Sequence, residues 1–341
     1  MNPGHYTRNE IFSQPDAWSA GLETMKGYQP SILGLQTTRD YAQILYTGCG
    51  STYYLALAAA ALTQEWTGLS SRAFPASELW LYPRSSYENS KTLLVAVSRS
   101  GETTETLRAC EAFCGEKRGD LLTLSCYGDM PLAKMGKVNL VLPSGQEQSV
   151  AQTRAFSTLY LATTVLAGLW AGRNDVFNAL ARLPEAGMRL LSNYSPLAAE
   201  VGRDSSIDRF YWLGSGPRYG LAAELSLKMK EMSLSHSEPF HFMEFRHGPK
   251  SMVTRSSLVI GLQSSINGPH EAAVLKDVGA LGGRILDIAE TDSRIHFDSG
   301  LDEALYNVLY LPIGQLIAFE RALSKNLDPD CPTNLDTVVK L

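Results

Sequence analysis

Short apolar runs recur along the chain, and four of them lead through a glycine- or serine-rich loop into a segment with helical spacing of apolar residues. The runs are continuous rather than alternating, which is typical of strands in a parallel sheet covered by helices on both faces. We therefore predict an α/β fold with parallel sheets. The expected strands lie at residues 44–46, 93–97, 121–124 and 138–141, and then at 210–213, 258–262, 285–288 and 308–311.

The pattern occurs twice. Fifty positions separate Gly48 from Ser98, and fifty also separate Gly214 from Ser264. This repeat predicts two tandem doubly wound domains of the flavodoxin or Rossmann type, in which ligands bind at the carboxyl ends of the strands. The expected organisation is an N-terminal helical segment at 1–30, a first domain at 31–190, and a second domain with a C-terminal tail at 200–341.

Composition narrows the class of protein. The 341 residues carry a net charge of −5, which argues against a nucleic-acid partner. The N-terminus lacks a basic and then apolar leader, and the longest apolar run, at 159–172, is shorter than the roughly 20 residues that span a bilayer. We expect a cytoplasmic protein with no membrane partner. The five cysteines form no C-x-x-C pair, and Cys110 and Cys114 are expected to be buried thiols.

The segment from Ser98 to Thr103 (SRSGET) leaves a predicted strand and opens a predicted helix. The free N–H groups and positive end of a helix favour an anion, and the hydroxyls of Ser98, Ser100 and Thr103 are further donors. Gly101 lets the backbone approach a ligand closely. A phosphate monoester fits this loop, although a plain capping box at Ser100 or Thr103 is the alternative.

Two glycine turns resemble this loop but do not indicate a nucleotide. The turn at 48–52 (GCGST) places Ser51 and Thr52 beside the expected phosphate loop. It is followed by Tyr53 where a dinucleotide fingerprint needs a third glycine, and the turn at 214–216 is followed likewise by Tyr219. We therefore expect no nicotinamide cofactor.

A helix expected at 221–233 carries Glu224, Lys228 and Glu231 on one face, because their offsets of four and three match the helical period. Such a face is usually a solvated set of ion pairs. The location at strand ends favours a second interpretation, in which a partly desolvated carboxylate acts as a general base.

Three histidines, His236, His241 and His247, follow this helix. Their spacings of five and six match no zinc motif, so we expect no metal site. The stretch at 244–250 is expected to be a loop, in which Gly-Pro after His247 fixes how the imidazole is presented.

Taken together, these motifs resemble the sugar-isomerase (SIS) family, which includes the isomerase half of glucosamine-6-phosphate synthase. They occur in the family's order along the chain. The matching segments are C-G-S-T at 49–52, S-x-S-G-E-T at 98–103, E-x-x-V-A-x-T-x-A-F at 147–156, L-K-x-K-E at 227–231 and H-G-P at 247–249.

The resemblance implies a role for each matching position. Gly50, Ser51, Thr52, Ser98, Arg99, Ser100, Thr103, Val150 and Gln152 would bind the sugar phosphate. Glu231 would move a proton between C1 and C2 of the opened sugar, with Lys228 near it, and His247 would open the ring. In the family, that histidine comes from the neighbouring subunit of a homodimer whose active sites lie at the interface.

The chain also departs from glucosamine-6-phosphate synthase. Nothing in it matches a glutaminase domain, and Thr333 and Thr337 stand where the synthase tail has an arginine and a Schiff-base lysine. Lys340 lies three residues too late to replace that lysine. The segments at 9–18 and 245–251 are more similar to the branch of the family named for tagatose-6-phosphate ketose/aldose isomerase.

We therefore expect an enzyme without metal or cofactor that isomerises a hexose 6-phosphate, specifically an amino-sugar 6-phosphate with loss of ammonia. A tagatose-6-phosphate type of isomerisation and the deglycation of fructosamine 6-phosphates are the alternatives within the family. A sugar-phosphate sensor is the alternative of another class. It is disfavoured because the roughly 30 residues before the first strand are too few for a DNA-binding domain.

Overall fold

The computed structural model describes residues 2–37, 41–87 and 91–339. The chain forms two compact units, and each unit is assembled from three separate stretches. The N-sheet unit comprises Asp16–Glu147, Arg154–Ala181 and Asp336–Leu341. The C-sheet unit comprises Met1–Pro15, Gln148–Thr153 and Arg182–Leu335. The domain boundaries expected from the sequence stay a prediction.

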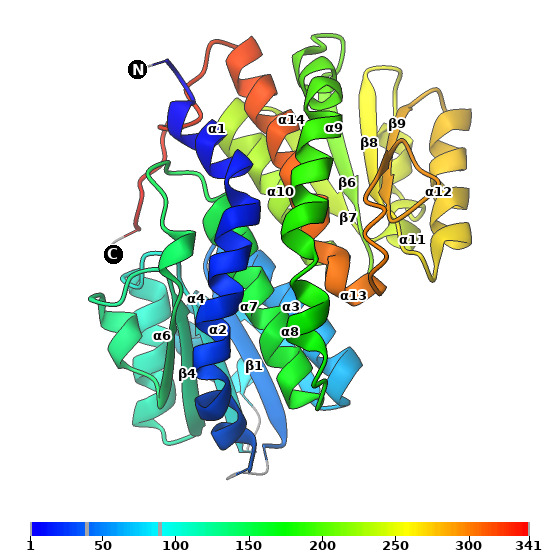
Figure 1. Cartoon of the computed structure of the whole chain (residues 1–341). Coiled ribbons are helices and arrows are strands. Elements are labelled where there is room, and N and C mark those ends of the chain that lie inside the picture. The colour runs from blue at the N-terminus through cyan, green and yellow to red at the C-terminus, as the bar shows by residue number, and fades with distance from the viewer. Residues whose placement is uncertain (1, 38–40, 88–90, 340–341) are drawn as a thin grey trace. The chain divides into compact units, whose positions relative to one another are not determined.

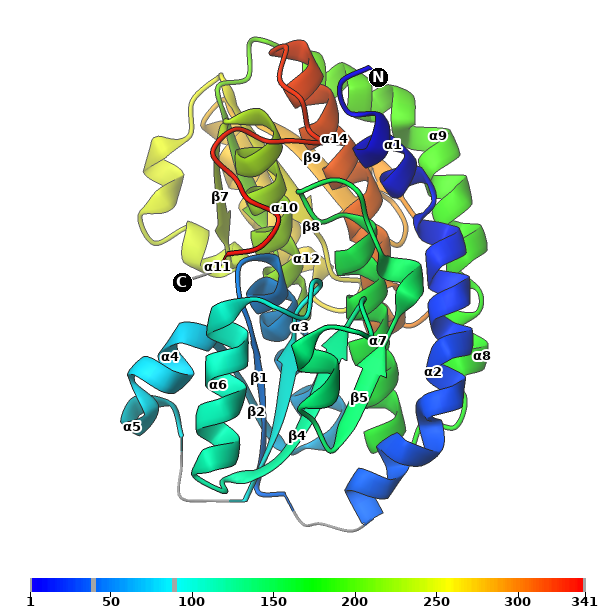
Figure 2. The same ribbon diagram turned by 90° about the vertical axis from the view of Figure 1, so that its left-hand side faces the viewer.

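The N-sheet unit contains a five-stranded parallel sheet in the order β2-β1-β3-β4-β5. Its strands are β1 (Gln43–Gly48), β2 (Ser70–Pro75), β3 (Thr92–Val97), β4 (Gly119–Ser125) and β5 (Val138–Val141). One face packs against α3 (Ser51–Thr67) and α7 (Arg154–Trp170), and the other against α4 (Ala76–Leu81) and α6 (Thr104–Gly115) (Figure 2). The unit also holds most of α2 (Gln14–Thr37), together with α5 (Pro83–Ser86) and α8 (Val176–Leu180).

The C-sheet unit contains a second parallel sheet in the order β10-β9-β8-β6-β7. Its strands are β6 (Arg209–Leu213), β7 (His236–Phe240), β8 (Ser257–Leu262), β9 (Arg284–Ala289) and β10 (Ile295–His296). Helices α9 (Leu183–Arg203), α10 (Pro217–Ser233) and α14 (Leu311–Ser324) cover one face, and α11 (Phe242–Phe245) and α12 (Gly268–Ala280) cover the other (Figure 1). Helix α1 (His5–Phe12) packs against α14. The short helix α13 (Glu303–Tyr306) lies before α14 in the chain.

Both sheets have the same topology, which confirms the predicted fold class of two doubly wound parallel α/β domains. In each sheet the strand order reverses between two central strands, β1 and β3 or β6 and β8, and this is where such folds bind ligands. The turn after the first central strand is also the same in both. Gly50 has φ +54° and Gly216 has φ +58°, a region that glycine enters without steric strain.

The predicted strand at 308–311 is wrong. Its residues lie in a 3₁₀ turn (Asn307–Tyr310) and in the first turn of α14. All four side chains are buried, and a short, wholly buried apolar run has the same pattern in a strand as in a core helix. The long apolar run at 159–172 mostly forms α7, whose side chains from Ala155 to Trp170 are all buried. In the described part of the chain, no helix has the length and apolar character to cross a bilayer.

Three strands lack the continuous apolar pattern and were not predicted, namely β2, β7 and β10. All three lie at the edge of a sheet. Edge strands tolerate polar residues and proline, since one side of their backbone has no ladder to maintain, and β2 and β7 contain Pro75 and Pro239.

The cysteine prediction holds for one of its two residues. Cys110 is buried in the core between α6 and the sheet, and this burial raises the pKa of its thiol. Cys114 is exposed near the end of α6, whereas its neighbour Phe113 takes the core position in that turn.

Candidate active site

The loop after β3 brings three hydroxyl groups together in the N-sheet unit. The Oγ of Ser98 lies 3.2 Å from the Oγ1 of Thr103 and 3.5 Å from the Oγ of Ser100, and the latter two atoms are 3.5 Å apart. Gly101 makes this compact turn possible, because it has φ +73° and an added Cβ would lie 2.9 Å from the Cβ of Met130. Thr103 occupies the N-cap position of α6, and its side chain makes no capping hydrogen bond to that helix. The predicted phosphate loop therefore has its hydroxyls converging at the N-terminus of a 12-residue helix.

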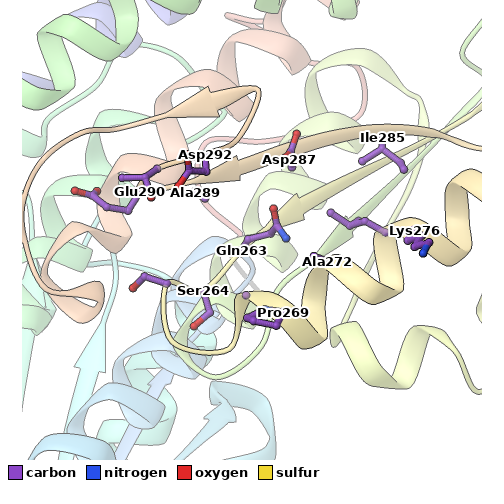
Figure 3. A pocket seen from close by; sticks show the side chains of 14 residues that line it. Gln263, Ser264, Pro269, Ala272, Lys276, Ile285, Asp287, Ala289, Glu290 and Asp292 are labelled. Atoms are coloured by element: carbon purple, nitrogen blue, oxygen red, sulfur yellow. The ribbon is translucent and has the colours of Figure 1, made fainter.

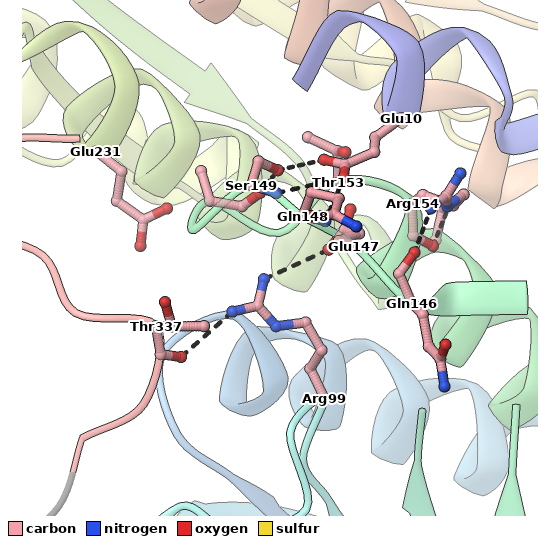
Figure 4. A network of polar contacts seen from close by, with 12 residues as sticks. Glu10, Arg99, Gln146, Glu147, Gln148, Ser149, Thr153, Arg154, Glu231 and Thr337 are labelled. Carbon is pink, nitrogen blue, oxygen red and sulfur yellow. Dashed lines mark hydrogen bonds and ion pairs between the residues drawn. The ribbon is translucent and has the colours of Figure 1, made fainter. Parts of the chain in front are cut away.

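Arg99, in the same loop, is buried and contacts two other segments of its unit (Figure 4). One guanidinium nitrogen lies 3.5 Å from the carboxylate of Glu147, and the other donates to the backbone carbonyl of Thr337 at 3.3 Å. The Thr104 N–H also donates to the carbonyl of Val339 at 3.4 Å. The C-terminal tail thus lies against the loop, whereas Lys340 is outside the described residues.

The turn after β1 lies beside this loop, because β1 and β3 are adjacent in the sheet. Ser51 and Thr52 are buried, and Gly50 is the residue before the first turn of α3. The hydroxyl of Thr52 accepts the Cys49 N–H at 2.9 Å and donates to the Cys49 carbonyl at 3.0 Å. Thr52 therefore holds the shape of the turn. A sugar contact for these residues stays a prediction.

Helix α10 carries the predicted acid–base group of the C-sheet unit. The Lys228 ammonium lies 3.3 Å from the carboxylate of Glu224 and is hydrogen-bonded to that of Glu231. Lys228 and Glu224 are fully buried, so the interpretation of this face as a solvated set of ion pairs is wrong. The Glu231 side chain keeps 19% of its surface exposed and is the member that a small molecule can reach.

Electrostatics keep this lysine charged. Burial alone would lower the pKa of Lys228, but the carboxylates of Glu224 and Glu231 outweigh it, so the pKa lies above its usual value. This charged lysine is hydrogen-bonded to Glu231, the carboxylate that the sequence predicts as a general base.

His247 lies in a turn that follows α11, and it is exposed. The predicted loop at 244–250 is only partly right, because the end of α11 and the start of a 3₁₀ turn (Pro249–Met252) fall within it. Gly248 has φ +127°, a conformation that requires glycine. Among the described residues, no hydrogen bond or ion pair joins His247 to the α10 group.

Val150 and Gln152 lie in the segment Gln148–Thr153, which belongs to the C-sheet unit. The Val150 N–H donates to the carbonyl of Asp330 at 3.0 Å. Gln152 is half-buried, and its buried Oε1 has no hydrogen-bond partner within the part of the chain that the structure describes. A buried amide oxygen in this state is available to a hydroxyl donor.

An ion cluster that the sequence analysis missed lies between the ends of β6 and β8. Arg218 is buried and pairs with Glu271 at 3.0 Å and with Glu303. The Glu303 carboxylate also accepts hydrogen bonds from the Ser264 hydroxyl at 2.6 Å and the Ile266 N–H at 3.1 Å. These residues are far apart in the sequence, so no local motif indicates the cluster.

A pocket of about 720 Å³ opens beside this cluster, at the carboxyl ends of β8 and β9 (Figure 3). Its lining includes Ser264, Lys276, Asp287 and Glu290, and none of the predicted substrate-binding residues. In the described ranges, no group of three or more His, Cys, Asp or Glu side chains could hold a metal ion.

Comparison with known proteins gives likenesses along the whole chain. It is 28% identical to glutamine–fructose-6-phosphate aminotransferase (isomerizing) of Bordetella parapertussis, over 97% of this chain and 57% of the relative. The chain thus spans little more than half the length of that relative. Glucosamine-6-phosphate deaminase from Thermotoga maritima is 28% identical, with a TM-score of 0.81 over 98% of this chain and 99% of the other.

A further solved structure supports the fold alone. Tagatose-6-phosphate ketose/aldose isomerase from Escherichia coli is 21% identical and has a TM-score of 0.86, over 97% of this chain and 96% of the other. The family model of the SIS domain matches residues 39–169, which contain the strands of the first sheet, and residues 205–299, which contain those of the second. The resemblance inferred from the motifs is confirmed, and the chain belongs to the SIS domain family.

Proposed function

We propose that this protein is a phosphosugar isomerase acting on an amino-sugar 6-phosphate, which it converts to a ketohexose 6-phosphate with release of ammonia. The observation that carries the proposal is the buried ion group on α10, where a charged Lys228 supports a partly exposed Glu231. The likeness to a glucosamine-6-phosphate deaminase over the whole chain supports the choice of an amino sugar.

In this proposal, the loop from Ser98 to Thr103 binds the phosphate and His247 opens the sugar ring. Glu231 takes the proton from C2 and returns it to C1, and one amine proton passes to the C1 oxygen, so that the aldehyde and amine become a C1 alcohol and a C2 imine through an enolamine. Water then adds to C2 and ammonia leaves, so one water is consumed for each ammonia released. Acid–base transfer of this kind contributes about 10²- to 10⁴-fold to the rate.

We also propose a homodimer in which each active site receives His247 from the partner. Its exposed turn supports this arrangement, since no hydrogen bond or ion pair joins the histidine to the α10 group in the described chain. A cytoplasmic location stays a prediction.

The test is a coupled assay for ammonia and ketose 6-phosphate, with glucosamine 6-phosphate and galactosamine 6-phosphate as parallel substrates. We expect ammonia from one of them, and a loss of at least about 100-fold in kcat for Glu231→Gln. Glu23→Gln is the matched control, because Glu23 is an exposed residue of α2. Ketose formation from an aldose without ammonia would replace deamination by simple isomerisation. A lack of turnover with any sugar phosphate would favour a sensor.

A further inference from the structure

The segment Gln148–Ser149–Val150 contributes its backbone N–H groups to acceptors that lie elsewhere in the sequence. The carboxylate of Glu10, on α1, accepts the N–H of Gln148 at 2.5 Å and that of Ser149 at 3.3 Å. It also accepts the hydroxyl of Ser149 (Figure 4). Glu10 and Ser149 are both buried. A carboxylate that accepts three hydrogen bonds in a buried place fixes the geometry of its donors.

The third N–H of the segment is fixed through the same helix. Val150 donates to the carbonyl of Asp330, and the Asp330 carboxylate accepts the N–H and the hydroxyl of Thr7, each at 2.7 Å. Its other oxygen accepts the Tyr6 N–H at 3.0 Å. Helix α1 therefore holds the segment directly through Glu10 and indirectly through Asp330. We call Glu10, Thr7 and Asp330 the α1 clamp.

The segment has no helix or strand of its own to fix it, since residues 146–153 contain neither. Residues 146–153 include Val150 and Gln152, the two sugar contacts that the family resemblance implies. Loops without regular structure have many backbone conformations, and ordering them before a ligand arrives removes that entropy from the binding step.

We propose that Glu10 is a positioning residue for substrate binding: through the α1 clamp it presents Val150 and Gln152 to the sugar. The proposal rests on the proposed function, because it takes these two residues as sugar contacts. It gives a functional reason for the segment at 9–18, which lies before the first sheet.

The experiment compares Glu10→Gln with Thr63→Val and with wild type. A glutamine offers one acceptor oxygen instead of two, so Gln148 and Ser149 lose charged hydrogen bonds. We expect KM for the sugar phosphate to rise about tenfold or more with kcat within about threefold, and amide exchange at Gln148 and Ser149 to accelerate by a similar factor. Thr63→Val removes a buried hydroxyl that is hydrogen-bonded to Tyr46 in the N-sheet unit and leaves the α1 clamp intact, so it is expected to lower the melting temperature while KM and those exchange rates stay within about twofold.

Two results would overturn the proposal. One is a folded Glu10→Gln variant with unchanged KM and unchanged amide exchange at Gln148 and Ser149. The other is a Thr63→Val variant that shifts both quantities as much as Glu10→Gln does, since the role of Glu10 would then be general stability. If Glu10→Gln does not fold, Ser149→Ala replaces it: a rise in KM with faster exchange supports the clamp, and no change rejects it. If wild type turns over no sugar phosphate, the proposed function fails, whereas the exchange measurement still decides whether Glu10 orders the segment.

Discussion

The two sheets reverse their strand order at equivalent positions, but the loops at these positions contain different polar groups. In the N-sheet unit, the loop after β3 holds three hydroxyls within 3.5 Å of one another at the start of α6. In the C-sheet unit, the loop after β8 donates to a carboxylate of the protein itself, that of Glu303, which Arg218 holds in place. An internal carboxylate satisfies there the kind of donors that would bind a phosphate in the other sheet. One fold, repeated, thus provides one loop suited to an external anion and one that is already occupied.

The largest expected effect comes from removing the hydroxyls of the open loop. We expect Ser98→Ala combined with Ser100→Ala to lower kcat/KM for a hexose 6-phosphate by about 10²- to 10⁴-fold. Each substitution removes a hydroxyl that would donate a charge-assisted hydrogen bond to the phosphate. The matched change in the occupied loop, Ser264→Ala combined with Ser265→Ala, is expected to leave KM unchanged. Steady-state kinetics of both variants make the comparison, and equal losses in the two would contradict it.

The next largest effect concerns stability in the occupied site. Arg218→Met leaves the carboxylates of Glu271 and Glu303 buried without their cation, and we expect a loss of about 3–5 kcal/mol in the free energy of unfolding. Arg203→Met, which breaks the more exposed pair with Glu320, should cost less than about 1 kcal/mol. Urea unfolding measures both. Similar losses would mean that the Arg218 cluster is no more important than a surface pair.

A smaller effect is expected when the internal carboxylate is removed. Glu303→Ala leaves Arg218 and the loop donors available, so we expect inorganic phosphate to stabilise this variant more than wild type, by about 1.4 kcal/mol at ten times its Kd. Thermal unfolding in phosphate, against chloride at the same ionic strength, is the measurement. A variant that unfolds at the same temperature in both salts would show that the loop needs Glu303 to keep its shape.

The smallest effect is a dependence of stability on pH. Burial alone would raise the pKa of Glu303, but Arg218 and hydrogen bonds from Ser264 and Ile266 bring it below the usual value. Its stabilising contribution is therefore complete above the unfolded value of about 4.3 and is lost as the pH falls through the lower folded pKa. Burial instead raises the pKa of Glu271, which acts in the opposite sense. The difference in unfolding free energy between wild type and Glu303→Gln isolates Glu303, and it should shrink as the solution is acidified.

The sequence predicted the central strands of each sheet and one edge strand, β5, and missed the other three edge strands. The central strands β1, β3, β4, β6, β8 and β9 each lie where an apolar run was found. The edge strands β2 and β7 contain proline and polar residues, so their pairing depends on a neighbour that no local pattern indicates.

The same limit applies to the candidate site. Short motifs located the loop at 98–103 and the α10 group, because each lies within one turn or one helix. The Arg218 cluster and the α1 clamp join residues up to hundreds of positions apart, such as Thr7 and Asp330, and only the fold brings them together.

The interleaved course of the chain has a consequence for biosynthesis. Thr7 leaves the ribosome well before Asp330, which accepts its N–H and hydroxyl and lies 323 positions later in the chain. At a synthesis rate of about 5–20 residues per second, α1 must wait roughly 16–65 seconds for that partner. Gln148 and Ser149 are synthesised before Asp330, so the contacts of Glu10 can form before those of Thr7. Helix α1 therefore gains its last partner only after Asp330 has been synthesised.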